Sequence, residues 1–287
     1  TRGIFGMRLI SVLKCHAETW SLRASPLNWA LYIYGEYMKL FDSQTRHLLH
    51  QVFDMADAYI RSDYHMGYIV DENDYTSNLC SEIRRIVNTH RIAFATTHSQ
   101  KLPRNLESFF GCDACIILID HNKNVGKICM FEAKADRKNW DKHDSNGNSH
   151  FSDQISRQKR AVRAGFAVWE QFYTKAINGA KVGYRSVSGS TCITYSNANN
   201  HNGTHPNSTV WNHKDIDLLS KQHGINLLSL GYIIENVCEC KKGSPKSVSE
   251  VKAFLKEKFK VSSLLLIQSG TEKEIEEVLE IVGKNDA

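Results

Sequence analysis

Three charged residues, Asp113, Glu132 and Lys134, lie at the ends of two apolar runs in the middle of the chain. The runs flank the polar segment His-Asn-Lys-Asn at residues 121–124, a pattern typical of a β-hairpin with a four-residue loop. In that register Asp113 lies opposite Glu132, with Cβ atoms about 5 Å apart. Lys134 projects to the same face as Glu132, because side chains alternate along a strand. The hairpin therefore predicts a cluster of two carboxylates and one ammonium group at its open end.

A divalent cation explains why such a cluster would be useful. Two neighbouring carboxylates repel each other, and an apolar sheet makes their ionisation more costly. Oxygen ligands of this kind suit Mg²⁺, and Mn²⁺ can substitute for it. The bound ion can hold a phosphate group and lower the pKa of an attacking water. Asp113 and Glu132 are thus candidate metal ligands, and Lys134 is a candidate for neutralising negative charge.

The competing interpretation is a cross-strand salt bridge between Lys134 and either carboxylate on a solvated sheet edge. Four apolar residues should share the face of the cluster, namely Ile117, Ile119, Ile128 and Met130. A charged trio at the end of an otherwise apolar strand pair is unusual for a surface exposed to solvent. This favours the metal site.

Asp113 followed by Glu132-Ala133-Lys134 resembles the signature of the PD-(D/E)XK nuclease superfamily, which has the restriction-endonuclease-like fold. Cys112 stands where the family's name places proline, a position that varies widely in the family. The resemblance implies an α/β protein with a mixed central β-sheet flanked by helices. It also implies Mg²⁺-dependent hydrolysis of DNA phosphodiester bonds, with double-stranded DNA favoured, in restriction or another defence against invading DNA.

In many family members an acidic residue on the preceding helix completes the metal site. Residues 72–87 have apolar side chains at helical spacing, and this stripe includes Leu79. Glu72 falls on the stripe at the N-terminal end, Glu82 falls at its margin, and Asp74 lies on the opposite side. We therefore expect Glu72 to be the third acidic metal ligand, although it could instead only complement the helix dipole.

Many members also carry a Gln-x-x-x-Gln helix after the ExK strand. Gln154 and Gln158 lie one turn apart at the edge of an apolar stripe that we extend from Ile155 through Val162 and Trp169 to Ile177. The two glutamines are expected beside the metal, where they could hold a water or a phosphate oxygen. Basic residues of this segment are expected to follow a phosphate backbone, with Arg157 and Arg160 reaching outward: Lys138, Arg157, Lys159, Arg160 and Arg163.

The coarse pattern of the chain predicts three regions. Residues 1–65 form an N-terminal helical region, in which 1–6 are interpreted as a tag remnant before Met7. Residues 66–240 form the nuclease core, and residues 241–287 form a C-terminal α-β-α extension. The polar stretch Ser196–Ser208 is expected to be a long surface loop.

Composition narrows the function classes. The net charge is +5, and residues 133–163 alone hold eight basic residues against four acidic ones, which fits a polyanionic partner. The longest apolar runs are too short to span a bilayer, so no membrane role is expected. Eight cysteines spread along 287 residues favour a reducing, cytoplasmic setting. Homodimerisation stays an open alternative.

Other sites were weighed on their motifs. Cys112, Cys115, Cys238 and Cys240 have loose spacing for zinc, so small buried side chains are expected instead. The residues around His201 and His205 suggest an HNH site but lack a ββα-metal pattern. No Walker A or GxGxxG motif is present. The main rival to an enzyme is a nuclease fold that binds nucleic acid, or acts as an interaction module, without turnover.

Overall fold

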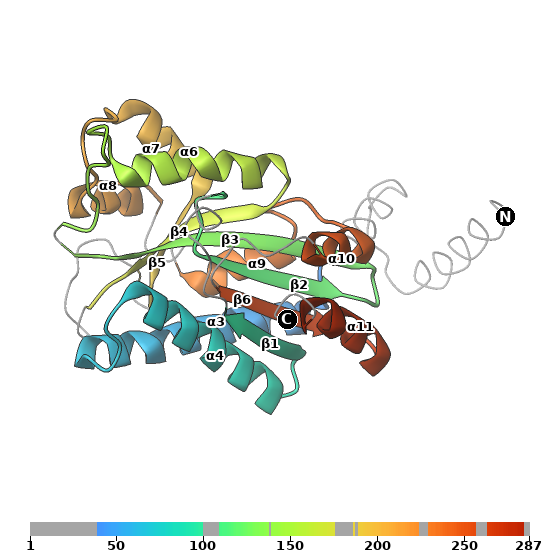
Figure 1. Ribbon diagram of the computed structural model, residues 1–287. Helices are drawn as coiled ribbons and strands as arrows, with labels where there is room; N and C mark the ends of the chain where they lie inside the picture. Colours follow the sequence, from blue (N-terminus) through green and yellow to red (C-terminus); the bar gives the residue numbers. More distant parts are fainter. Residues whose placement is uncertain are drawn as a thin grey trace, which may run out of the picture. The chain divides into compact units, whose positions relative to one another are not determined.

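The computed structural model describes residues 39–99, 109–137, 139–175, 186, 189–223, 229–256 and 263–283. These residues belong to one compact unit, Met38–Ala287. They form an α/β fold in which eight helices flank a mixed six-stranded sheet, as the sequence predicted (Figure 1). The described residues contain no helix with the length and apolar character needed to cross a membrane.

The sheet has the order β1-β6-β2-β3-β4-β5. Its strands are β1 (Phe94–Ser99), β2 (Ala114–Asp120), β3 (Val125–Ala135), β4 (Ala167–Tyr173), β5 (Thr191–Thr194) and β6 (Ser263–Ser269). The pairs β1–β6, β2–β3 and β4–β5 are antiparallel, and the pairs β2–β6 and β3–β4 are parallel.

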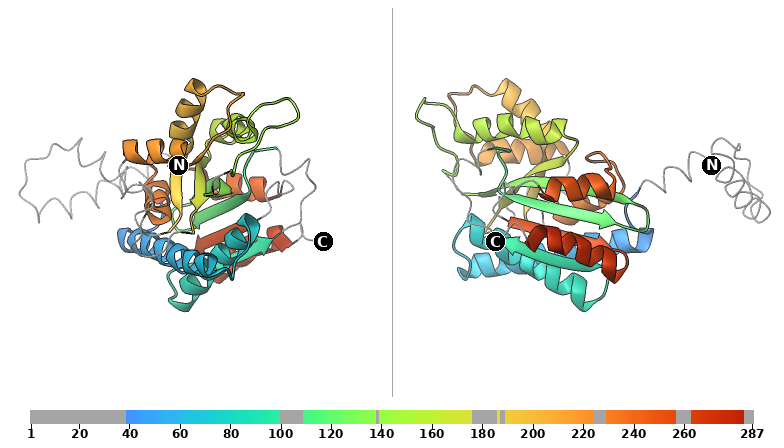
Figure 2. Two further views of the ribbon diagram at one scale, coloured as in Figure 1. Left: turned by 90° about the vertical axis from the view of Figure 1, so that its left-hand side faces the viewer. Right: turned by 45° about the vertical axis from the view of Figure 1, so that its right-hand side comes forward.

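Alternation along the central strands builds two cores, one on each face of the sheet. Ile116 and Phe131 pack in one core, while Ile117 and Met130 pack in the other, as period-two patterning requires. The first face is covered by α3 (Ser43–Met66), α4 (Glu72–Thr89) and α9 (Leu230–Cys238). The second face is covered by α6 (His150–Arg163), α7 (Tyr195–Thr204), α8 (His213–His223), α10 (Val248–Lys256) and α11 (Glu272–Gly283). Figure 2 shows the two helical layers from other directions.

The C-terminal segment has the predicted order of helix, strand and helix in α10, β6 and α11. However, β6 lies between β1 and β2, where both of its edges are paired. The segment therefore completes the central sheet instead of standing beside a finished core. Of the predicted N-terminal region, the structure describes the residues from 39 on. Helix α3 of this region packs against α4 and α9 in the same unit.

Two sequence-based expectations about elements are wrong. The apolar stripe that starts at Ile155 does not continue as one helix, because α6 ends at Arg163 and Gly165 adopts a φ of 82°. The residues that follow form β4, and Val162 is 37% exposed instead of facing inward; Ile177 lies outside the described residues. The expected loop at 196–208 is largely helix α7.

Candidate active site

The hairpin of β2 and β3 has the predicted register, from Asp120↔Val125 to Ala114↔Phe131. Asp113 comes immediately before the paired residues of β2, and its backbone N–H donates to the Phe131 carbonyl at 2.9 Å. Its carboxylate accepts a hydrogen bond at 2.9 Å from the N–H of Ala133, the residue after Glu132, which is the partner of Asp113 in the predicted register. Asp113 and Glu132 therefore meet at the end of the hairpin away from the turn, as expected.

The last residues of β3, 132–135, extend beyond β2 and lack that neighbour. Backbone N–H groups on this edge need other acceptors. Asp113 supplies one, and Glu72 supplies the next, since its Oε1 accepts from the Ala135 N–H at 2.7 Å. Glu72 is the first residue of α4, whose N-cap is Asp71. Thus the structure brings Glu72 to the ExK strand, whereas Glu82 pairs with Arg85 on α4.

Glu132 is a fully buried carboxylate, with 1% of its surface exposed. Its Oε1 accepts hydrogen bonds from the Lys134 ammonium and from the Gln154 amide. Its Oε2 is buried and has no hydrogen-bond partner in the described part of the chain. Burial, followed by the neighbouring charge of Asp113, raises the pKa of Glu132 well above its ordinary value, against the opposing effect of Lys134.

Lys134 stays charged in this setting. Burial acts to lower the pKa of Lys134, but the carboxylates of Glu132, Asp113 and Glu72 outweigh burial, so that the pKa is raised. The ammonium group, whose side chain is 13% exposed, is thus held in place by several negative groups. A fixed positive charge of this kind can stabilise negative charge that develops on a substrate.

Sequence reasoning missed a further buried carboxylate, Glu170. It faces Glu132 in the parallel pairing of β3 and β4, and it is 1% exposed. Burial raises the pKa of Glu170 to about 8, while a hydrogen bond from Gln158 opposes the shift. A signal was present: a glutamate within the apolar run 166–173, after the helix-ending Gly165, is unexpected in a buried strand.

Both glutamines of α6 face this cluster, as predicted. Gln154 donates to Glu132, and its own Oε1 is buried without a partner among the described residues. Gln158 donates at 3.0 Å both to Glu170 and to the carbonyl of Gly111. The helix begins at its N-cap Ser149, whose hydroxyl oxygen accepts from the Ser152 N–H. The two glutamines, one helical turn apart, thus contact glutamates on two adjacent strands, β3 and β4.

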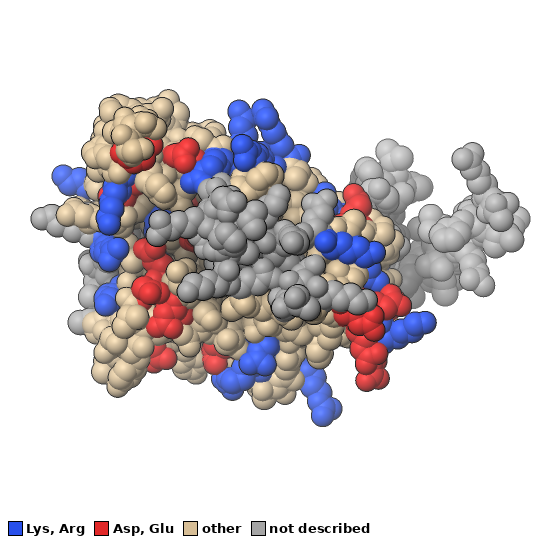
Figure 3. Space-filling model, viewed as in Figure 1, with Lys and Arg blue, Asp and Glu red and all other residues tan. Residues whose placement is uncertain are grey.

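The basic residues proposed for DNA contact differ in their exposure to solvent and in whether they already pair with other groups. Lys159 and Arg163 are exposed on α6, and Arg160 is exposed but donates to the Phe109 carbonyl at 3.1 Å. Arg157 is only 20% exposed and lies 2.9 Å from the Asp153 carboxylate, so it does not project freely outward. Figure 3 shows Lys and Arg side chains gathered over α6 at the top of the view. Lys138 lies outside the described residues.

The three expected metal ligands do not form a compact coordination group. Within the described residues, the group with three ligand atoms inside 4.8 Å consists of His201, His205 and Asp215, and does not include Glu72, Asp113 or Glu132. The carboxylates of Glu72 and Asp113 each accept a hydrogen bond from a backbone N–H of β3. The donor chemistry still fits Mg²⁺, because Glu132 offers a buried carboxylate oxygen with no partner among the residues described.

The cysteines weighed as zinc ligands behave as small core residues where they are buried. Cys112, Cys115 and Cys238 are at most 2% exposed and pack within the two cores on either face of the sheet. Burial raises the pKa of each of these three thiols, so they stay protonated.

Comparison with known proteins gives no match to any family model, curated protein or solved structure.

Proposed function

We propose that this protein is a metal-dependent nuclease that hydrolyses DNA phosphodiester bonds. The supporting observation is the buried Glu132 carboxylate, which has one oxygen held by Lys134 and Gln154 and the other without a partner among the described residues. An acidic group in such a setting is costly unless a cation or a proton compensates its charge. Perturbed carboxylates beside a fixed ammonium are typical of catalytic sites.

Glu132 and Asp113 would hold Mg²⁺ or Mn²⁺, and Glu72 would support them from α4. The ion, when bound, supplies a site for the scissile phosphate and lowers the pKa of a water molecule. The binding of such an ion requires the Asp113 and Glu72 carboxylates to share their oxygens with it, or to release the backbone N–H groups of β3. Each of these carboxylates has a second oxygen for this purpose.

The remaining groups act on the substrate and the water. Lys134 is charged and would stabilise the negative charge that develops on the phosphate in the transition state. The Gln154 side chain would orient a water or a phosphate oxygen without adding charge, since its Oε1 has no partner among the described residues. Burial raises the pKa of Glu170 to about 8, so its protonated side chain would limit the negative charge beside Glu132.

Digestion of plasmid DNA with purified protein tests the proposal, with Mg²⁺, Mn²⁺ or a chelator present. Asp113→Ala, Glu132→Ala and Lys134→Ala should each lower cleavage about a hundredfold or more, because each removes an electrostatic element of the transition state. Glu82→Ala on α4 is the matched control and should leave cleavage near that of the wild type. Near-wild-type cleavage by any of the three variants, in folded protein, removes that residue from the mechanism.

The alternative is a nuclease fold that binds nucleic acid without turnover, which the basic residues of α6 would equally serve. DNA binding in the absence of metal-dependent cleavage would establish that alternative. We propose restriction or another defence against invading DNA as the biological setting, on the resemblance alone. Digestion of methylated and unmethylated DNA, followed by sequencing of the ends, tests this setting.

A further inference from the structure

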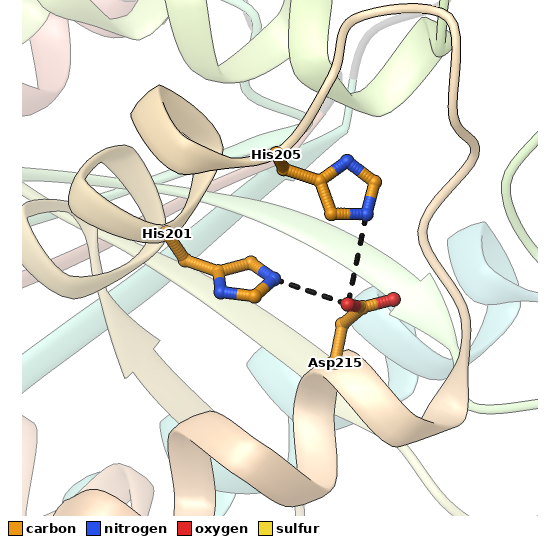
Figure 4. Close-up of side chains that lie close together, drawn as sticks. All are labelled: His201, His205 and Asp215. Carbon is orange, nitrogen blue, oxygen red and sulfur yellow. Dashed lines mark hydrogen bonds and ion pairs between the residues drawn. The ribbon is translucent and has the colours of Figure 1, made fainter.

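A second cluster lies away from the carboxylates, between α7 and α8. His201 in the last turn of α7 and His205, the C-cap residue that follows, project toward Asp215 in the first turn of α8 (Figure 4). The His201 Nε2 lies 3.1 Å from Asp215 Oδ1, and the His205 Nε2 lies 3.6 Å from the same oxygen. One ligand atom of each residue lies within 4.8 Å of the others. Three donor atoms from two helices thus converge on one point.

The geometry of the cluster matches the coordination of a small ion. Donors about 2.0–2.1 Å from one tetrahedral ion are separated from each other by about 3.3 Å. The distances of the two Nε2 atoms from Asp215 Oδ1, 3.1 and 3.6 Å, lie on either side of this value. His205 is the C-cap residue of α7, and its backbone N–H donates to the His201 carbonyl at 3.0 Å. The two rings, four residues apart, therefore lie on the same side and can bind one ion.

The surroundings also favour a bound ion. The three side chains are only 10–14% exposed, and both imidazoles lie against the ring of the buried Trp211. The other ring nitrogen of His205, Nδ1, points away from Asp215, so Nε2 is the nitrogen that faces the other two donors (Figure 4). Paired imidazoles in such a site lose hydration, and coordination compensates that loss.

The helix that carries the histidines needs external support. Its sequence, Tyr-Ser-Asn-Ala-Asn-Asn-His-Asn-Gly-Thr, contains four asparagines and a glycine, which favour helix poorly. Thr194, its N-cap, makes no capping hydrogen bond through its side chain, and Ala198 is the one buried residue of α7. Neither propensity nor burial therefore accounts for the stability of this helix.

We propose that His201, His205 and Asp215 bind Zn²⁺, which fastens α7 to α8. Two imidazole nitrogens and one carboxylate oxygen are ligands that Zn²⁺ commonly takes, with water in the fourth position. This site is chemically distinct from the carboxylate cluster, whose oxygen donors suit Mg²⁺. Asp215 is pre-positioned for the role, because its other oxygen accepts from the Asn212 N–H at 2.8 Å.

Metal analysis and thermal unfolding of the full chain test the proposal. After chelation and dialysis, titration with zinc alone should load about one ion per chain. A hundredfold excess over Kd should raise Tm by about 5–10 °C. The variant His201→Asn/His205→Gln should bind zinc at least about tenfold more weakly and lose the zinc-dependent rise in Tm. His213→Asn, which removes an exposed histidine from the first turn of α8, is the matched control and should behave as the wild type.

Each outcome decides the assignment. Equal zinc binding by the wild type and the double variant, or no binding by the folded wild type, would show that the cluster is held by hydrogen bonds to Asp215 alone. Preferential loading with Fe²⁺ in a competition titration would overturn the choice of zinc. If the double variant does not fold, Asp215→Asn replaces it, since the asparagine oxygen can still accept from the Asn212 N–H. Because metal content and Tm are measured without DNA, the result does not depend on nuclease activity.

Discussion

At the residue scale, the candidate active site is defined by carboxylates whose environments differ. Glu132 and Glu170 face each other on adjacent strands inside the protein, while Asp113 and Glu72 are partly exposed and accept from backbone N–H groups. Burial raises the pKa of both inner glutamates, to about 8 in the case of Glu170, and so favours their protonated forms. A cation and a proton are therefore alternative ways to stabilise the same cluster.

Glu170→Gln should make the stability of the protein less dependent on pH. The unfolded glutamate loses its proton near its ordinary pKa of 4.5, whereas the folded one keeps it to about 8. The folded state binds more protons in that window, so stability falls as pH rises through it. Glutamine removes this contribution and should stabilise the protein at pH 8, relative to wild type, by on the order of a few kcal/mol.

Urea denaturation at pH 5 and pH 8 measures this difference. In Glu170→Gln, the pH dependence of the unfolding free energy should be smaller than in the wild type but still present, because Glu132 also has a raised pKa. Glu276→Gln, at an exposed position of α11, serves as the control and should keep the wild-type slope. An unchanged slope in Glu170→Gln would show that Glu170 is ionised in the folded protein at neutral pH.

Glu72→Gln should weaken Mg²⁺ binding, as seen in the Mg²⁺ dependence of cleavage, more than Glu82→Gln does. The glutamine oxygen can still accept from the Ala135 N–H, so the variant should fold, but it removes a negative charge that acts on Lys134. We expect the Mg²⁺ concentration for half-maximal cleavage to rise about tenfold. Magnesium titrations of both variants in the plasmid assay compare them. A larger effect of Glu82→Gln would transfer the supporting role to that residue.

At the element scale, the site depends on the fit of α6 against the segment that enters β2. Gly111 adopts a φ of 64°, and its carbonyl accepts a hydrogen bond from Gln158. A Cβ atom at this position would lie 2.5 Å from the Gln154 carbonyl oxygen. The absence of a side chain therefore lets the backbone approach the helix that carries both glutamines.

Gly111→Ala should destabilise the protein by on the order of 3 kcal/mol, since it combines a left-handed backbone with a clash against helix backbone. Gly147→Ala is a matched control: Gly147 has a φ of 78°, but a Cβ there would meet nothing within 4 Å. That variant should lose only about 1 kcal/mol. Chemical denaturation of both variants provides the comparison, and equal losses would contradict the packing argument.

At the scale of the whole molecule, the distribution of charge matters more than the net value of +5. The exposed Lys159 and Arg163 lie on α6, the helix that contacts the carboxylate cluster through Gln154 and Gln158. Phosphates that follow this helix would pass near the proposed metal site. Arg157 is less suited than the sequence suggested, because it is paired with Asp153.

DNA binding by the Lys134→Ala protein should weaken steeply as salt rises, because each neutralised phosphate releases condensed counterions. Lys159→Ala/Arg163→Ala in that background should flatten the slope of log K against log salt by about two, on any sequence. Lys252→Ala/Lys273→Ala removes the same charge from α10 and α11 and should leave the slope nearly unchanged. Equal slopes for the two double variants would place the DNA path elsewhere.

The sequence by itself determined the hairpin and the residues that it aligns. Its register follows from a polar tetrapeptide between two apolar runs, so Asp113, Glu132 and Lys134 come together through local pairing alone. Helical spacing placed Glu72 on the inward stripe of its helix. Gln154 and Gln158 were expected at the edge of a stripe and were singled out by the family resemblance. All three contact the strands of the cluster. These are short-range patterns, which a sequence displays directly.

Only the tertiary structure decided the contacts between segments that are distant in the chain. The run 166–173 carries a stripe compatible with either a helix or a strand, and pairing with β3 and β5 made it a strand, which buried Glu170. The place of β6 between β1 and β2 depends on non-local pairing in the same way. His201, His205 and Asp215 meet because α7 and α8 pack together around Trp211, although the helix propensity of α7 is low. In each case packing outweighs local preference, because burial and pairing contribute more free energy than propensity does.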